Sequence, residues 1–240
     1  MPSAAVIVIG DEILTGKFPD DNGPFLIRRL RALGADLGRL AIIGDSPDAI
    51  ADEVSRCSAD YDHVITTGGV GPTHDDRTLE GVALAVGRQL VVAPRLLALL
   101  DRFGMERSDA NLSMATIPEG AELIDAPGSS FPVVRVVNVW VLPGIPSLMR
   151  TKFEDIATHF AGSQVHVERL YCTQGESEIA DRLAEVEARY SDVSIGSYPR
   201  WGESQYRVMI TADSRDESQL REAVRALRDA IRCVELTSDV

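Results

Sequence analysis

A glycine-rich segment between a predicted strand and a predicted helix constrains the fold of this chain more than any other feature. Residues 66–73 read Thr-Thr-Gly-Gly-Val-Gly-Pro-Thr, and an acidic pair follows at Asp75 and Asp76. Residues 63–65 predict a short buried strand, and residues 78–86 predict a helix capped by Thr78. A strand, a glycine turn and a helix in this order are typical of α/β proteins with a mostly parallel sheet.

The chemistry of this segment predicts a phosphate site with a divalent metal. Glycine lacks a Cβ atom, so the backbone N–H groups of residues 68–71 can approach an anion, and the start of the next helix adds partial positive charge. A carboxylate beside a phosphate repels the ligand unless a cation lies between them or the carboxylate transfers a proton. Asp75 or His74 would then activate water. The alternative is a structural turn capped by Asp75 or Asp76.

Two earlier predicted strands also end in carboxylates. Residues 4–9 form a continuous apolar run, as expected for a central parallel strand, and Asp11 and Glu12 follow it closely. Residues 40–43 form a second such strand, which Asp45 follows. Ligands of open α/β sheets bind at the carboxyl ends of the strands. The alternative for Asp11 and Glu12 is a solvated turn. The predicted metal ligands are Asp11, Glu12, Asp45 and Asp76.

Two later segments place further turns beside predicted strands. Residues 126–132 form a glycine- and hydroxyl-rich turn that contains Ser129, and residues 133–137 and 138–142 read as adjacent strands. Gly144 follows the second of them and either lines the cleft or only turns the chain.

A change in composition at residues 161–163 predicts a domain boundary, with domains over residues 1–162 and 163–240. The pattern of the second domain predicts strands and helices in the order β-α-β-β-α, a small α+β unit. Its last helix is predicted to begin with a capping box formed by Ser214 and Glu217. Trp201 and Tyr206 either stack on a ligand or partner, or only pack within the domain or lie exposed on its surface.

Charge and cysteine content exclude several classes of partner. A net charge of −13 and a pI near 4.7 argue against nucleic acid and anionic membranes, because both require a basic surface.

The chain has 3 cysteines without paired spacing, which predicts reduced thiols and a cytoplasmic protein. Cys57 continues an apolar helical stripe and is predicted to be core. Residues 4–9 are too short for a membrane span or signal segment.

The motifs, in their order, resemble the molybdopterin-binding (MoCF) domain family, as found in the N-terminal region of CinA-type competence/damage-inducible proteins and in eukaryotic FAD synthases. They are Gly10-Asp11-Glu12-Ile13-Leu14-x-Gly16, Asn22, Gly44-Asp45, Thr67-Gly68-Gly69-x-Gly71-Pro72-Thr73-x-Asp75-Asp76-x-Thr78, Ile117-Pro118-x-Gly120-Ala121, Ala126-Pro127-Gly128 and Leu142-Pro143-Gly144-Ile145-Pro146. The resemblance implies a three-layer α/β fold with a mostly parallel sheet. The last third resembles the small KH-like domain that follows in CinA-type proteins.

The resemblance also implies two possible functions. In some relatives the domain splits the pyrophosphate of ADP-ribose or FAD with a divalent metal such as Mg, Mn or Co. In others it binds molybdopterin and transfers an adenylyl group to it. The density of carboxylates favours the hydrolase. The predicted catalytic residues are Asp76, Asp75, Asp45 and His74. The predicted ligand-binding residues are Gly68, Gly69, Gly71, Thr73, Gly10, Asn22, Ser129 and Gly144.

We also expect the protein to form a homodimer, with a trimer as the alternative. The second domain has few strands and two amphipathic helices, so one face of its sheet stays uncovered unless it packs on something. CinA-type relatives are dimeric, which the resemblance extends to this chain.

Overall fold

The computed structural model describes residues 1–125, 127, 130–202 and 205–235. The chain divides into two compact units, Met1–Gly162 and Ser163–Val240.

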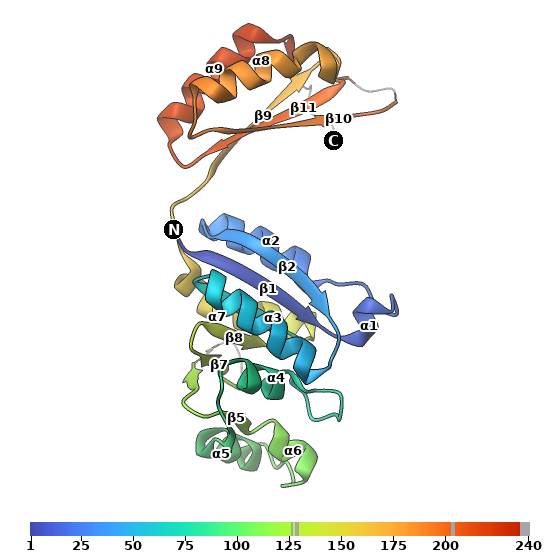
Figure 1. The fold of residues 1–240 in the computed structure, drawn as a ribbon, viewed down its shortest axis with the longest axis vertical. Helices are drawn as coiled ribbons and strands as arrows, with labels where there is room; N and C mark the ends of the chain where they lie inside the picture. The colour runs from blue at the N-terminus through green and yellow to red at the C-terminus, as the bar shows by residue number, and fades with distance from the viewer. Residues whose placement is uncertain (126, 128–129, 203–204, 236–240) are drawn as a thin grey trace. The chain divides into compact units, whose positions relative to one another are not determined.

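The first unit is built on a mostly parallel sheet with the strand order β2-β1-β3-β8-β7-β6 (Figure 1). The central strand β1 pairs in parallel with β2 and β3, and β3 pairs in parallel with β8, whereas β7 and β6 continue the sheet in antiparallel fashion. The strands are β1 Ser3–Ile9, β2 Asp36–Ile43, β3 His63–Thr67, β6 Glu122–Ile124, β7 Val133–Val136 and β8 Val139–Leu142.

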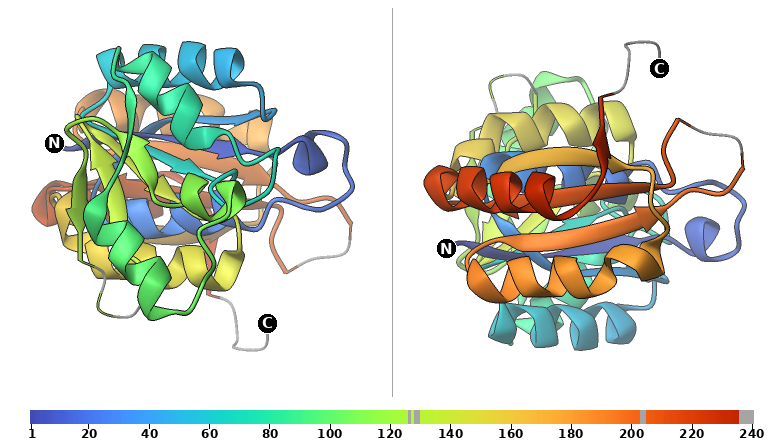
Figure 2. Two further views of the ribbon diagram at one scale, coloured as in Figure 1. Left: turned by 90° about the horizontal axis from the view of Figure 1, so that it is seen from below. Right: turned by 90° about the horizontal axis from the view of Figure 1, so that it is seen from above.

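Helices cover both faces of this sheet, which confirms the predicted α/β class (Figure 2, left). Successive side chains of β1 point to opposite faces of the sheet, as in any strand. Val6 packs in the cluster that includes residues of α2 and α7, and Ile7 packs in the cluster that includes residues of α3, α4 and α5. The main helices are α2 Asn22–Leu33, α3 Pro47–Asp60, α4 Thr78–Ala85, α5 Pro94–Arg102 and α7 Pro146–Ile156.

Smaller elements complete the unit. The segment after β1 is a short helix, α1 Asp11–Leu14, rather than an open turn. A further short helix, α6 Asp109–Ser113, lies between α5 and the ladder strand that follows it in the chain. A separate two-stranded ladder joins β4 Leu90–Val92 to β5 Thr116–Pro118, and a 3-10 turn, η1 Ala157–Phe160, ends the unit.

The second unit is an antiparallel sheet with the strand order β10-β11-β9-β12 and two helices on one face (Figure 1). The elements are β9 His166–Cys172, α8 Glu176–Arg189, β10 Ser194–Pro199, β11 Val208–Ser214, α9 Glu217–Ala230 and β12 Cys233–Val234. The predicted capping box was wrong, because Asp216 caps α9 by accepting hydrogen bonds from the backbone N–H groups of Ser218 and Gln219. Within the described part of the chain, no helix is long and apolar enough to cross a membrane.

Cys57 belongs to the core, as predicted. Its side chain is fully buried in α3, and that burial raises the pKa of the thiol to about 11. It therefore stays protonated and unreactive at neutral pH.

Candidate functional site

The glycine turn after β3 is held by close backbone packing. Gly68 has a φ of 109°, and a Cβ atom there would lie 2.0 Å from the carbonyl oxygen of Ile9. Gly69 has a φ of 61°, and its Cβ would lie 2.5 Å from Thr78 Oγ1. Both positions therefore require glycine for the fold, independently of any ligand.

Thr78 anchors the same turn but does not cap the helix. Its hydroxyl donates to the carbonyl oxygen of Gly68 at 2.7 Å, and its N–H donates to that of Gly69 at 2.9 Å. Arg77 occupies the N-cap position of α4 without a side-chain cap, so the prediction that Thr78 caps this helix was wrong.

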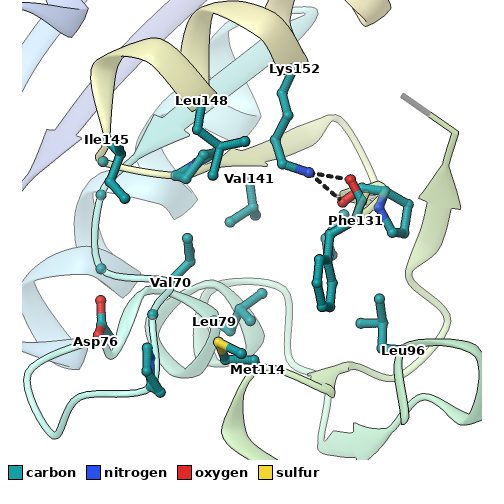
Figure 3. A pocket seen from close by; sticks show the side chains of 18 of the residues that line it. Val70, Asp76, Leu79, Leu96, Met114, Phe131, Val141, Ile145, Leu148 and Lys152 are labelled. Carbon is teal, nitrogen blue, oxygen red and sulfur yellow. Dashed lines mark hydrogen bonds between the residues drawn. The ribbon is translucent and has the colours of Figure 1, made fainter. Parts of the chain in front are cut away.

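A cavity of about 860 Å³ opens beside this turn, in the size range of ligand sites (Figure 3). Gly68, Gly69, Gly71 and Gly144 line it, as predicted from the glycine motifs. Most of its wall is apolar, a property that the motifs did not indicate. The apolar lining includes Val70, Leu79, Leu96, Met114, Phe131, Val134, Val141, Ile145 and Leu148.

Two of the predicted carboxylates, Glu12 and Asp76, belong to the cavity lining. Asp76 Oδ2 accepts hydrogen bonds from the backbone N–H of Thr73 at 2.9 Å and from its hydroxyl. Asp76 therefore supports its own turn with one oxygen, and Oδ1 makes no protein hydrogen bond among the described residues. The structural role thus uses Oδ2, and the predicted catalytic and metal-binding role of Asp76 stays a prediction.

Asp11 and Asp45 form a second acidic group at the ends of β1 and β2. The N–H of Asp11 donates to Asp45 Oδ2 at 2.9 Å. Burial raises the pKa of Asp45, and the negative charges of Asp11, Glu12 and Asp75 act in the same direction. Strand ends thus gather carboxylates as expected, although neither Asp11 nor Asp45 lines the cavity.

No group of three or more His, Cys, Asp or Glu side chains that could hold a metal ion occurs among the described residues. Of the described carboxylates, Glu12 and Asp76 are the two that line the cavity, so a metal there would need oxygen atoms from the ligand and from water as well. Magnesium commonly binds in this way, through one or two carboxylates together with substrate phosphates.

The remaining predicted residues lie in different places. Thr73, His74 and Asp75 are exposed and do not line the cavity. At Gly10, a Cβ atom would lie 2.6 Å from the carboxylate oxygens of Glu12. Ser129 lies outside the described residues.

Asn22 is buried at the carboxyl ends of the strands, where its side chain links three segments of the chain. Its Nδ2 donates to Thr67 Oγ1 at 3.0 Å and to the carbonyl oxygen of Gly144 at 2.8 Å. Its Oδ1 has no partner among the described residues. A neighbouring cavity of about 460 Å³, which Glu12, Gly68 and Gly144 also line, borders Asn22.

Lys152 is the functional candidate that the motifs did not reveal. It lies on α7 with only 6% of its surface exposed, and its ammonium donates to the carbonyl oxygens of Phe131 and, at 3.1 Å, Pro132 (Figure 3). Burial lowers the pKa of Lys152 to about 8, an effect that Asp155 opposes. A lysine at the helical spacing of Met149, Phe153 and Ile156 was the available sequence signal.

Comparison with known proteins supports the assignment made from the motifs. Residues 5–162 match the family described as probable molybdopterin binding domain, and residues 164–237 match the FAD synthase middle domain. A probable FAD synthase of Caenorhabditis briggsae is 35% identical over 259 residues, which cover 95% of this chain and 49% of that protein. A CinA-like protein of Syntrophobacter fumaroxidans is 33% identical over 231 residues, which cover 91% of this chain and 54% of that protein.

The chain thus spans about half the length of these relatives. Among solved structures, CinA of Thermoplasma acidophilum, itself of unknown function, superposes with a TM-score of 0.61 at 29% identity, over 67% of this chain and 99% of that one. The family model covers well over half of the sequence and agrees with the motifs and the sheet topology. This chain therefore belongs to the molybdopterin-binding domain family.

Proposed function

We propose that the protein hydrolyses the pyrophosphate bond of a nucleotide pyrophosphate such as FAD or ADP-ribose with the help of a divalent metal. The observation that supports this most is the division of one cavity into two chemical regions. Glu12 and Asp76 provide carboxylates, and the rest of the lining is largely apolar, with Phe131 and Lys152 across the cavity from Asp76 (Figure 3). FAD and ADP-ribose have the same division, between charged phosphates and at least one flat ring system.

The residues fit a metal of the magnesium type. Asp76 Oδ1 and the carboxylate of Glu12 would hold it, and the pyrophosphate would supply further oxygen ligands. When bound, the cation neutralises the phosphate charge that this acidic region would otherwise repel. Cobalt and manganese accept similar oxygen ligands and are the other candidates.

The glycine turn and the side chains beside it would position the reacting phosphates. The turn of Gly68 to Gly71 shapes the wall against which the phosphates lie, and the hydrogen bonds from Thr73 keep Asp76 in place. Water adds to one phosphorus atom, the bridging P–O bond breaks, and two monophosphates leave, of which one is AMP. Asp75 and His74 are the proposed proton acceptors from this water.

Turnover with purified protein tests this proposal. We expect FAD or ADP-ribose to yield AMP, detected by chromatography, in the presence of Mg²⁺, Mn²⁺ or Co²⁺, and no AMP with EDTA. Asp76→Asn should lower turnover by about 100-fold, because loss of one charge-stabilising group typically costs this much. The amide oxygen can still accept from Thr73, so the turn should persist.

Asp75→Asn is a second variant for comparison, with the same change of charge at the neighbouring residue. We expect a loss of roughly tenfold if His74 can replace it as proton acceptor. Normal turnover in Asp76→Asn, or AMP formation that survives EDTA, would rule out the proposed roles of Asp76 and of the metal.

Molybdopterin binding without hydrolysis is the second candidate. The family description and the apolar lining of the cavity favour it. A protein that binds FAD or a pterin in calorimetry, but releases no AMP with any of the three metals, would support this function instead.

A further inference from the structure

Two cysteines of the second unit, far apart in the sequence, lie opposite each other on neighbouring strands. Cys172 ends β9 and Cys233 begins β12, and the antiparallel register pairs the two residues directly. Residues paired in this way point to the same face of a sheet. Both side chains accordingly pack in the core beside helices α8 and α9, where Cys172 is fully buried and Cys233 is half-buried. Both are free thiols.

The two cysteines form the closer of the two kinds of pair that occur in antiparallel sheets. At the next position of the ladder, the backbone N–H of Thr173 donates to the carbonyl oxygen of Arg232 at 3.3 Å, so that pair is hydrogen-bonded. The two kinds alternate, which makes Cys172 and Cys233 a non-hydrogen-bonded pair, with a typical Cα–Cα separation of about 4.5 Å. A disulfide requires Cα atoms about 4.4–6.8 Å apart. The strand register therefore fits a disulfide without a change of backbone.

Neighbouring groups hold the two strands at this register. The backbone N–H of Arg232 donates to Gln174 Oε1 at 2.8 Å, and the N–H of Gln174 donates to Cys172 Sγ at 3.4 Å. Burial raises the pKa of the Cys233 thiol, an effect that Arg228 opposes and that the charge of a Cys172 thiolate strengthens. This mutual influence is expected of sulfur atoms that lie close to each other.

We propose that Cys172 and Cys233 form a reversible disulfide that fastens β12 to β9 when a small-molecule disulfide, such as oxidised glutathione, is present. The thiolate of the more accessible Cys233 attacks one sulfur of this oxidant, whose S–S bond breaks and releases one thiol. The Cys172 thiolate then attacks the Cys233 sulfur of the mixed disulfide and releases the second thiol. The two protons and two electrons that the cysteines lose are carried by the two thiols released.

The disulfide would make the stability of the second unit depend on the redox state of its surroundings. β12 lies at the edge of the sheet and contains two residues, so few backbone hydrogen bonds hold it. The closed loop would run from residue 172 to residue 233 and would enclose α8, β10, β11 and α9. A cross-link over so long a loop strongly restricts the unfolded chain. The inference concerns the second unit and does not depend on hydrolysis in the first.

Oxidation of the full-length protein with oxidised glutathione tests the proposal. Alkylation in denaturant should find three thiols before oxidation and one after it, and mass spectrometry of unreduced peptides should find Cys172 joined to Cys233. Amide hydrogen exchange in β9 and β11 should slow by at least about tenfold, whereas exchange in β1 should not change. Dithiothreitol should restore the three thiols and the original exchange rates.

A shift of the thiol by one residue provides the matched control. Val234 pairs with Tyr171, and its side chain points to the opposite face of the sheet from that of Cys233. The double variant Cys233→Ser with Val234→Cys keeps three cysteines, but its new thiol faces away from Cys172, so oxidation should not join the two. Cys57→Ala, in the core of the first unit, should still lose two thiols on oxidation.

A wild type that keeps three thiols in excess oxidised glutathione, or that stops at a mixed disulfide with glutathione, would overturn the proposal. Equal cross-linking of residues 172 and 234 in the double variant would overturn it as well, because the strand register would then not direct the reaction. A disulfide that forms without slowing exchange in β9 and β11 would overturn its stabilising role.

Discussion

Lys152 is a buried charge whose surroundings affect the stability of the fold. Its side chain sits among apolar residues of α7 and the cavity, with backbone carbonyl oxygens as its hydrogen-bond partners. Removing an ammonium from water has a cost that such neutral partners offset only in part. The lowered pKa of Lys152 reflects this cost.

The pKa predicts a specific dependence of stability on pH. The pKa of Lys152 is about 8 in the folded protein, against an ordinary 10.5, so between these values the unfolded chain carries a proton that the folded one has lost. Stability rises with pH wherever the unfolded state binds more protons. Relative to Lys152→Met, the wild type should therefore gain up to about 3 kcal/mol of unfolding free energy across this window.

Urea denaturation of both proteins at about pH 7, 8, 9 and 10 measures this difference. Subtraction removes the cysteine and tyrosine titrations that the two proteins share. A difference that stays constant with pH would contradict the lowered pKa of Lys152.

Glycines of the turn after β3 give a second prediction at this scale. Gly68→Ala should cost about 3 kcal/mol or more, because the added Cβ meets the backbone of β1 and the residue keeps a positive φ. Gly104→Ala is the control: Gly104 has a φ of 66° but open space around it, and the substitution should cost about 1 kcal/mol. Equal losses, measured by chemical denaturation, would mean that the contact with Ile9 is unimportant.

Among the elements, those with a strong local pattern were predictable. The apolar run of β1, the helix α2 ending at Gly34 in a left-handed conformation, and the adjacent strands β7 and β8 all follow from periodicity and glycine placement. The ladder between β4 and β5 was not predicted, because it joins segments that are distant in sequence and short. Local pattern carries little information about such pairs.

The candidate site was predictable at its turns but not at its walls. Gly68, Gly69, Gly71, Gly144 and Asp76 line the cavity because their motifs follow strands whose ends meet. The apolar wall draws residues from α4, α5, α7 and β8, and no local pattern distinguishes a cavity residue from a core residue. The number of carboxylates that reach the cavity also depends on side-chain direction, which strand order does not determine.

At the scale of the whole molecule, the sheet of the second unit has one face that its own helices do not cover, and this face bears on how the protein assembles. The helices α8 and α9 cover the face formed by Leu170 and Ile210. On the other face, Val167 and Tyr198 are 41% and 52% exposed. Apolar side chains on an exposed sheet face favour a partner.

We therefore expect a homodimer that uses this face. Tyr198→Asp should convert it to a monomer, as measured by light scattering of the full-length protein, because a carboxylate would be buried without a partner in the contact. Glu185→Ala, on the exposed side of α8, is the control and should remain dimeric. A monomeric wild type, or a Tyr198→Asp variant that is still dimeric, would contradict this role of the sheet face.

Under the proposed function, the acidic group at the ends of β1 and β2 would also affect how the nucleotide substrate arrives. Asp11, Glu12 and Asp75 act electrostatically on Asp45, and the chain as a whole carries a charge of −13. A free dinucleotide diffusing toward this edge is repelled, most strongly at low ionic strength, and its encounter rate falls. A dinucleotide already complexed with a divalent cation carries less negative charge. Cation and nucleotide should therefore enter together, so that the concentration of their complex, rather than that of the nucleotide alone, controls the rate of association.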